Sequence, residues 1–343
     1  MSSKSLHCVG FLLFAAAALH GQATYYSATQ PDCSSLGTSN GPIAITNSSN
    51  VTLGYSCYVS GTFVWYDAGG GWNSSIRMNA PASGAVFVDY LFYDRSGNAQ
   101  SLDTAVLGNS TISSGSEYNF VLAADQPSEI DLFGLAGTGP NYTEAWGSVY
   151  ATIYCPDANT CSDATPQLIY SALPSHPWSI SVPISWDQNL WTQWSAGAVD
   201  DGSTNIAALV IYNQNSTASS YTVKVFDSNG NLAGSGVTPP IPPLQALGGG
   251  NFGEGGTSAV LLSQIVKPLP SGIFKILVDG GTQLSSVEVL QFKGPSATSL
   301  QVAYDSAPAI ASAAKASKRA APRRALRQPA PPAHGFPGPG VTN

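Results

Sequence analysis

The chain has 343 residues, of which 43% are hydrophobic, and a formal net charge of −7. It is long enough to form more than one domain with a hydrophobic core of its own. All 20 acidic residues lie between Asp32 and Asp305, where only six basic residues oppose them, so this part of the chain is strongly negative and nucleic acid is not an expected partner.

Residues 1–23 have the pattern of a secretory signal peptide. Lys4 precedes an apolar stretch from Val9 to Leu19, and the small residues Gly21 and Ala23 mark a cleavage site. A membrane anchor is the alternative, but a helix needs about 20 apolar residues to cross a bilayer, and this stretch is shorter. We therefore expect a protein exported through a signal peptide to the exterior or the cell surface, without a transmembrane segment.

Four cysteines follow the signal peptide, namely Cys33, Cys57, Cys155 and Cys161. An even number of cysteines in an exported chain predicts structural disulfides, and proximity favours pairing Cys33 with Cys57 and Cys155 with Cys161. A metal site is the alternative, but neither pair has the two-residue spacing of zinc ligands.

The body of the chain is predicted to be all-β. Branched and aromatic residues concentrate in short runs between clusters of Gly, Pro, Ser and Asn, which is typical of strands. The clearest runs are 85–93, 146–155, 206–212, 221–226, 272–278 and 287–292. In the run 221–226 Lys224 should point outward, and the alternation in 287–292 predicts one buried face and one wet face.

A turn motif indicates an internal repeat. The strand that ends at Tyr93 is followed by Asp94-Arg95-Ser96-Gly97-Asn98, and the strand that ends at Phe226 is followed by Asp227-Ser228-Asn229-Gly230-Asn231. In each turn the Asp carboxylate can accept hydrogen bonds from turn amides, and Gly supplies a positive φ. We therefore predict two tandem antiparallel β-sandwich domains of about 110 residues each.

The predicted organisation has six parts. They are a signal peptide (1–23), an N-terminal disulfide-containing segment (24–60), a first sandwich (61–173), a Trp/Pro-rich linker (174–195), a second sandwich (196–305) and a basic Ala/Pro-rich disordered tail (306–343). The tail is interpreted as a solvated segment, with a tether to an anionic surface or to the acidic body as the alternative.

The pattern Gly-Gly-Gly-Trp, strand, polar break, strand ending in Tyr93-Asp94, and then Ser-Gly-Asn resembles a duplicated Ig-like repeat of secreted bacterial proteins of unassigned function. The resemblance covers roughly residues 61–305 and implies the fold. It carries no catalytic residue, and the second half departs from it by lacking the Trp and by an insertion rich in Pro and Gly.

Catalytic chemistry finds little support in the sequence. His176 is the single histidine of the body, no nucleophile-elbow motif is present, and no pair of carboxylates stands out as a glycosidase pair. Asp89 interrupts an apolar strand, and we interpret it as a residue turned toward solvent on a mixed face. No cofactor is expected.

The candidate binding residues are Trp178, Trp186, Trp191 and Trp194, which lie between the two halves. Indoles stack on sugar rings, and they also fill domain junctions. The leading hypothesis is a non-catalytic extracellular structural or adhesive protein that contacts polysaccharide or other cell-surface components. A carbohydrate-binding module that uses these tryptophans is the first alternative, and a hydrolase that uses carboxylates is the second.

Overall fold

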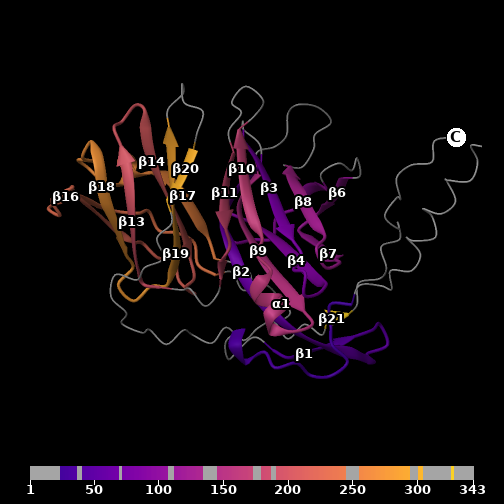
Figure 1. Ribbon diagram of the computed structural model, residues 1–343. Helices are drawn as coiled ribbons and strands as arrows, with labels where there is room; N and C mark the ends of the chain where they lie inside the picture. The colour runs from indigo at the N-terminus through magenta and orange to yellow at the C-terminus, as the bar shows by residue number, and fades with distance from the viewer. Residues whose placement is uncertain are drawn as a thin grey trace, which may run out of the picture.

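The computed structural model describes residues 24–36, 41–68, 72–106, 112–133, 145–172, 179–186, 191–244, 255–293, 300–303 and 326–327. More than half of these residues belong to β-strands, and the strands form two sandwiches (Figure 1). The all-β prediction is confirmed. The helical segments are short: η1 (Ser34–Leu36), α1 (Ala158–Asp163) and α2 (Leu262–Ile265). Among the described residues no helix is long and apolar enough to cross a membrane.

Two sheets form the first sandwich. Sheet I has the order β21-β1-β2-β9-β4-β7, with β12 also paired to β2. Its strands are β1 (Ile43–Thr46), β2 (Thr52–Ala68), β4 (Val86–Asp94), β7 (Glu117–Leu122), β9 (Ala145–Cys155), β12 (Ser185–Trp186) and β21 (Leu326–Arg327). Sheet II has the order β11-β10-β3-β8-β5-β6. Its strands are β3 (Trp72–Asn79), β5 (Leu102–Val106), β6 (Ile112–Gly115), β8 (Pro127–Phe133), β10 (Gln167–Ala172) and β11 (Ser179–Pro183).

Two four-stranded sheets form the second sandwich. Sheet III has the order β13-β18-β15-β16, and sheet IV has the order β17-β14-β19-β20. The strands of sheet III are β13 (Gln193–Asp200), β15 (Thr222–Phe226), β16 (Leu232–Val237) and β18 (Gly272–Asp279). The strands of sheet IV are β14 (Asn205–Asn213), β17 (Thr257–Leu261), β19 (Ser285–Lys293) and β20 (Leu300–Ala303).

The two sandwiches have the same strand order. In chain order, β2, β3, β4, β7, β8, β9, β10 and β11 of the first correspond to β13 through β20 of the second. The path β2-β9-β4-β7 in sheet I then matches β13-β18-β15-β16, and β11-β10-β3-β8 in sheet II matches β20-β19-β14-β17. The β5–β6 hairpin is an addition at the edge of sheet II. In each set of eight strands the first lies beside the sixth, which is β2 beside β9 in one sandwich and β13 beside β18 in the other.

The two Asp turns occupy matching positions, after β4 and after β15. Asp94 Oδ1 accepts the amides of Ser96 and Asn98 at 2.7 and 2.9 Å. Asp227 Oδ1 accepts the amides of Asn229 and Asn231, both at 2.9 Å. Gly97 and Gly230 both have φ of 83°, a conformation that glycine adopts without steric cost. The predicted turn chemistry is therefore confirmed at both sites.

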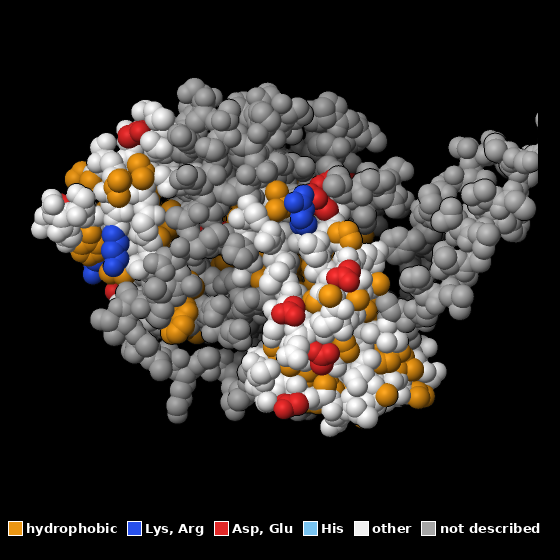
Figure 2. Space-filling model, in the orientation of Figure 1, with side chains coloured by type: hydrophobic (Ala, Val, Ile, Leu, Met, Phe, Trp, Pro, Cys, Tyr) orange, Lys and Arg blue, Asp and Glu red, His pale blue; other side chains and the backbone are white. Residues whose placement is uncertain are grey.

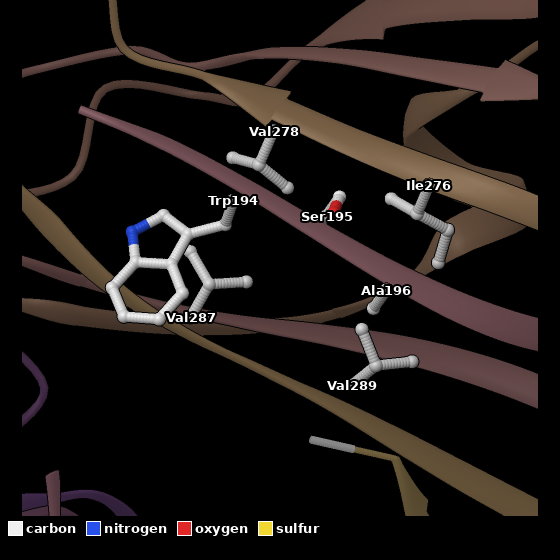
Figure 3. Close-up of a pocket in the computed structure, with 7 residues that line it drawn as sticks. All are labelled: Trp194, Ser195, Ala196, Ile276, Val278, Val287 and Val289. Carbon is white, nitrogen blue, oxygen red and sulfur yellow. The ribbon is translucent and has the colours of Figure 1, made fainter. Parts of the chain in front are cut away.

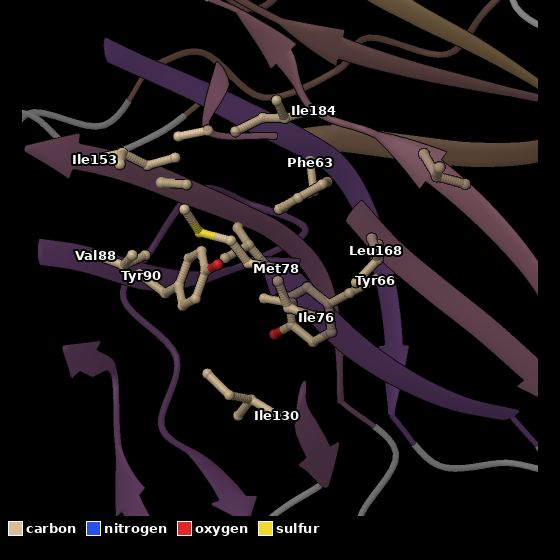
Figure 4. Close-up of a cluster of buried hydrophobic side chains, with 14 of the residues drawn as sticks. Phe63, Tyr66, Ile76, Met78, Val88, Tyr90, Ile130, Ile153, Leu168 and Ile184 are labelled. Carbon is tan, nitrogen blue, oxygen red and sulfur yellow. The ribbon is translucent and has the colours of Figure 1, made fainter. Parts of the chain in front are cut away.

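Each sandwich encloses a hydrophobic core between its sheets. In the first, Phe63, Tyr66, Tyr90 and Met78 are buried among branched aliphatic side chains (Figure 4). In the second, the alternate residues of β15 and β18 that face inward, such as Val223 and Ile276, form a separate cluster. As predicted, Lys224 is not part of this core and faces outward, half-buried.

Both predicted disulfides are present. Cys33 is bonded to Cys57 and Cys155 to Cys161, with Cα–Cα distances of 5.5 and 5.4 Å. The first joins the segment before β1 to β2, and the second joins the end of β9 to α1. Asp157 caps α1 by accepting the amide of Thr160 at 2.8 Å, so the segment after Cys155 is a short capped helix.

The second sandwich packs directly against the first. Ala208, Val210 and Tyr212 on β14 and Leu290 on β19 belong to the same buried cluster as the core of the first sandwich. At this junction Thr257 Oγ1 donates to the carbonyl oxygen of Val64 at 2.7 Å. Because residues of β14 are buried on both of its faces, sheet IV lies between the core of the second sandwich and a buried apolar junction that is continuous with the core of the first.

This junction corrects the expectation of a wet face on the strand 287–292. Val289 packs into the core of the second sandwich, and Leu290 packs toward the first. Glu288, which shares a face with Leu290, is only 5% exposed. The alternation along the strand predicted that Glu288 and Leu290 face solvent, but the first sandwich covers this face of the strand. Asp89, by contrast, is half-buried on the outer face of sheet I.

Some expected boundaries fall inside strands. The expected limit between residues 60 and 61 lies within β2, which runs without interruption from Thr52 to Ala68. The expected linker 174–195 contains β11, which pairs with β10, and β12, which pairs with β2. The signal peptide and His176 lie outside the described residues, as does the tail except for Leu326–Arg327, which pairs in parallel with β1.

Candidate functional site

Trp194, one of the predicted binding residues, lies inside the second sandwich. Its side chain is 5% exposed, and its indole nitrogen donates to the carbonyl oxygen of Ser285 at 3.0 Å. It lines a small cavity together with Val287 and Ile276 (Figure 3). The cavity has a volume of about 10 Å³, which is at the limit of what one water molecule needs. Trp194 therefore stabilises the core of the second sandwich.

The other three predicted tryptophans are placed differently. Trp191 is half-buried against the second core, and its backbone exchanges hydrogen bonds with Ser285. Trp186 lies in β12 opposite Gly61 of β2, and its side chain is outside the described residues. Trp178 is outside the described residues altogether. The structure thus brings Trp191 and Trp194 together around Ser285.

A second aromatic group lies where the sandwiches meet. The rings of Trp65 on β2 and Trp146 on β9 are 4.6 Å apart, and the guanidinium of Arg95 lies 4.8 Å from the centre of the Trp146 ring. The carbonyl oxygen of Arg95 accepts the amide of Thr257 from the second sandwich at 3.0 Å. Trp65 is buried and Trp146 is half-buried, so a half-buried indole and the cation over its ring lie together at the junction.

Sequence reasoning missed this group because its members lie far apart along the chain. Trp65 and Trp146 are neighbours only through the antiparallel pairing of β2 with β9, and a bulge in β2 between Phe63 and Tyr66 shifts that register. The Asp94 turn is the one sequence feature that points to this group, because it fixes the backbone conformation around Arg95.

The outer face of sheet II carries two neighbouring carboxylates. Glu129 and Asp131 lie on the same face of β8, two residues apart. Glu129 accepts Ser75 Oγ at 3.1 Å and forms a salt bridge with Arg77 at 2.7 Å. Burial and the neighbouring Glu129 raise the pKa of Asp131. Glycoside hydrolysis needs two carboxylates that flank the substrate, so this pair is a candidate for the hydrolase hypothesis.

Glu288 is the one buried carboxyl group with a large shift among the described residues. Burial raises its pKa to about 8, because removal from water disfavours the charged form. Within the described part of the chain, its Oε2 has no hydrogen-bond partner. At neutral pH the carboxyl group is therefore mainly protonated.

Metal binding and homology add no further assignment. The described residues contain no group of three or more His, Cys, Asp or Glu side chains that could hold a metal ion. Comparison of the chain with protein-family models, with curated proteins and with solved structures finds no significant match. The function must therefore be argued from the surfaces and the junction themselves.

Proposed function

We propose that the protein is a non-catalytic extracellular structural or adhesive protein that contacts polysaccharide or other cell-surface components. The observation that carries this proposal is the junction: Ala208, Val210 and Tyr212, on the outer face of sheet IV, pack into the same buried cluster as the core of the first sandwich. A buried apolar junction holds the outer sheet faces in fixed relative positions, which suits a scaffold that presents surfaces. The two disulfides support maturation in an oxidising compartment.

The proposal is tested by retention on isolated cell envelopes and by turnover of polymeric substrates. The oxidised chain is expected to bind envelopes saturably and to release no soluble product. Release of product that is lost in both Glu129→Gln and Asp131→Asn would contradict the proposal and support a hydrolase instead. Arg77→Gln is the matched control, because it removes the neighbouring charge without removing a carboxylate.

Carbohydrate binding is the second candidate function, supported by the half-buried Trp146 beside Arg95. Indoles with an accessible face bind sugar rings by stacking. A polysaccharide that binds here should quench tryptophan fluorescence in the parent chain and less in Trp146→Phe. Trp194→Phe is the control, because the Trp194 indole is buried. Equal quenching in the parent and in Trp146→Phe would remove this site.

We also propose that the two sandwiches descend from one duplicated Ig-like unit of a secreted bacterial protein. The shared strand order and the matching Asp94 and Asp227 turns support duplication. Relatives that contain a single eight-stranded unit with the same turn would test it, and relatives in which the two units have different strand orders would contradict it.

A further inference from the structure

The outer face of sheet III carries an unusual share of the exposed apolar surface. Ile273 on β18 is 72% exposed, and Leu232 and Val237 on β16 are 57% and 61% exposed. These are three of the five large hydrophobic residues that are exposed in the described part of the chain. The half-buried Phe226 and Leu277 lie on the same face. Apolar side chains gathered on one face of a soluble protein indicate an interaction surface.

Two lysines lie among these apolar residues. The pairing of β15 with β18 sets Phe226 opposite Lys275 and Lys224 opposite Leu277, so the two ammonium groups are diagonal neighbours. Neither lysine forms a salt bridge with any described residue. Figure 2 shows Lys or Arg atoms beside hydrophobic atoms at the left-hand end, where Figure 1 places β16 and β18. Asp279 lies on the same face, opposite Thr222, so the two lysines leave this apolar face with a net positive charge on an otherwise acidic body.

The matching face of the first sandwich is covered by the chain itself. On sheet I, Tyr25 stacks on Phe87 with ring centres 5.1 Å apart, and Ile45 of β1 joins the same buried cluster with Tyr58 and Tyr154. The described residues provide no corresponding cover for sheet III. One of two equivalent sheet faces is thus closed within the chain, and the other is open.

A complementary face exists at the other end of the same molecule. Sheet II presents Glu129 and Asp131, against the single cation Arg77, on an outer face whose Gln167 and Ser181 are exposed. Asp131 forms no salt bridge with the described residues, and its pKa is raised in part by repulsion from Glu129. Figure 1 places β16 and β18 at one end of the molecule and β8 and β6 toward the other.

We propose that a second copy of this chain docks the outer face of its sheet II onto the outer face of sheet III, so that Lys224 and Lys275 pair with Glu129 and Asp131. The contact joins two different faces of the same molecule, so it repeats from copy to copy and produces a ring or an open array. The inference names a partner for the structural role proposed above and rests on that role.

Charge reversal on the oxidised full chain tests this contact by sedimentation velocity at several concentrations and at low and high salt. The parent should form species larger than a monomer that weaken at high salt, because salt screens the lysine–carboxylate pairs. Lys224→Glu and Lys275→Glu should each weaken association by about tenfold. Lys267→Glu is the matched control, because Lys267 is exposed in the segment before β18 and away from the outer face of sheet III.

A charge swap makes the test specific. Asp131→Lys should weaken association, and Asp131→Lys combined with Lys275→Glu should restore it, since the pair is then reversed. Ile273 is mostly exposed, so Ile273→Ser should weaken association without a change in the thermal melting of the chain. If all of these variants associate as strongly as the parent, the inference is overturned.

The outcomes also separate this inference from the proposed function. A chain that stays monomeric at every concentration overturns the inference, while envelope binding by that monomer would leave the structural role in place. If the lysine variants instead lose binding to an anionic polysaccharide and the parent is monomeric, sheet III is a glycan surface and self-association is overturned.

Discussion

The two sandwiches fix the same connection by different chemistry. In the first, the connection from β9 to β10 is held by the Cys155–Cys161 disulfide and by Thr160 Oγ1, which hydrogen bonds to Ser83 Oγ at 3.0 Å. In the second, the connection from β18 to β19 is held by Asn215, which donates to the carbonyl oxygen of Leu284 at 2.8 Å and accepts its amide at 2.9 Å.

A buried asparagine organises the second arrangement. Asn213 is fully buried, and its Nδ2 donates to the carbonyl oxygens of Thr217, Ile241 and Pro242. Its Oδ1 accepts the hydroxyl of Tyr221 at 3.1 Å. The same strand order is therefore compatible with a disulfide at this connection in the first sandwich and with an asparagine hydrogen-bond network in the second. What the fold requires is that this connection be held, since its backbone polar groups must find partners.

The largest expected effect concerns the junction that unites the two sandwiches. Glu288 has a pKa of about 8 when folded, against 4.5 as its ordinary value. A carboxyl with a raised pKa binds its proton more tightly in the folded state, so the free energy of unfolding should fall as pH rises from about 4.5 to about 8, by up to about 5 kcal/mol. Urea unfolding at pH 5, 7 and 9, values chosen to bracket these pKa values, measures the loss.

Glu288→Gln isolates this contribution because it keeps the side chain's shape and removes its charge. The variant should be more stable than the parent above the folded pKa and should lose most of the pH dependence in that range. Glu117→Gln is the control, because Glu117 is exposed on β7. A parent and variant with parallel pH profiles would show that Glu288 is ionised in the folded state.

The second effect is loss of the amide network. Asn213→Ala removes one hydrogen bond from three carbonyl oxygens and from the Tyr221 hydroxyl, which keep second partners. It also leaves the backbone amide of Asn215 without its acceptor, and an unsatisfied buried group costs about 1–3 kcal/mol. We expect a loss of about 3 kcal/mol in the free energy of unfolding. Asn229→Ala, in an exposed turn, should change it little. A small loss in Asn213→Ala would mean that water replaces the amide, and the comparison with the disulfide would fail.

The smallest effect is expected for the covalent lock in the first sandwich. Cys155 and Cys161 are separated by 6 positions in the chain, and closing so short a loop contributes about 2 kcal/mol in the chain-entropy model. The double variant Cys155→Ala/Cys161→Ala should lose this amount in urea unfolding. The Cys33–Cys57 bond, with a separation of 24, should contribute more when removed in the same way. The reverse order would show that packing around α1 outweighs loop entropy.

Most of the confirmed predictions depend on interactions between residues that are close together in the sequence. The strands around residues 206–212 and 272–278, the Asp94 and Asp227 turns and the pairing of nearby cysteines all depend on short stretches of chain, where propensity and spacing are informative. They are present as expected, with strand ends that differ by a few residues.

Long-range packing explains what the sequence could not predict. Glu288 lies on a strand in which polar and apolar residues alternate, and this pattern predicts that its polar side faces solvent. That side is buried because the first sandwich packs against it. Trp65 and Trp146 meet through a bulged pairing between β2 and β9. The length of β2, which crosses an expected boundary, depends on partners supplied by β1, β9 and β12. None of these contacts is encoded in residue spacing.

The apolar outer side of β14 has a practical consequence for work on fragments. Expressed alone, residues of the second half would expose Ala208, Val210 and Tyr212 to water, and the first half would lose the side chains that cover Val64 and Trp65. Isolated halves should therefore aggregate, or recombine when mixed. Truncation experiments on this chain need both halves present.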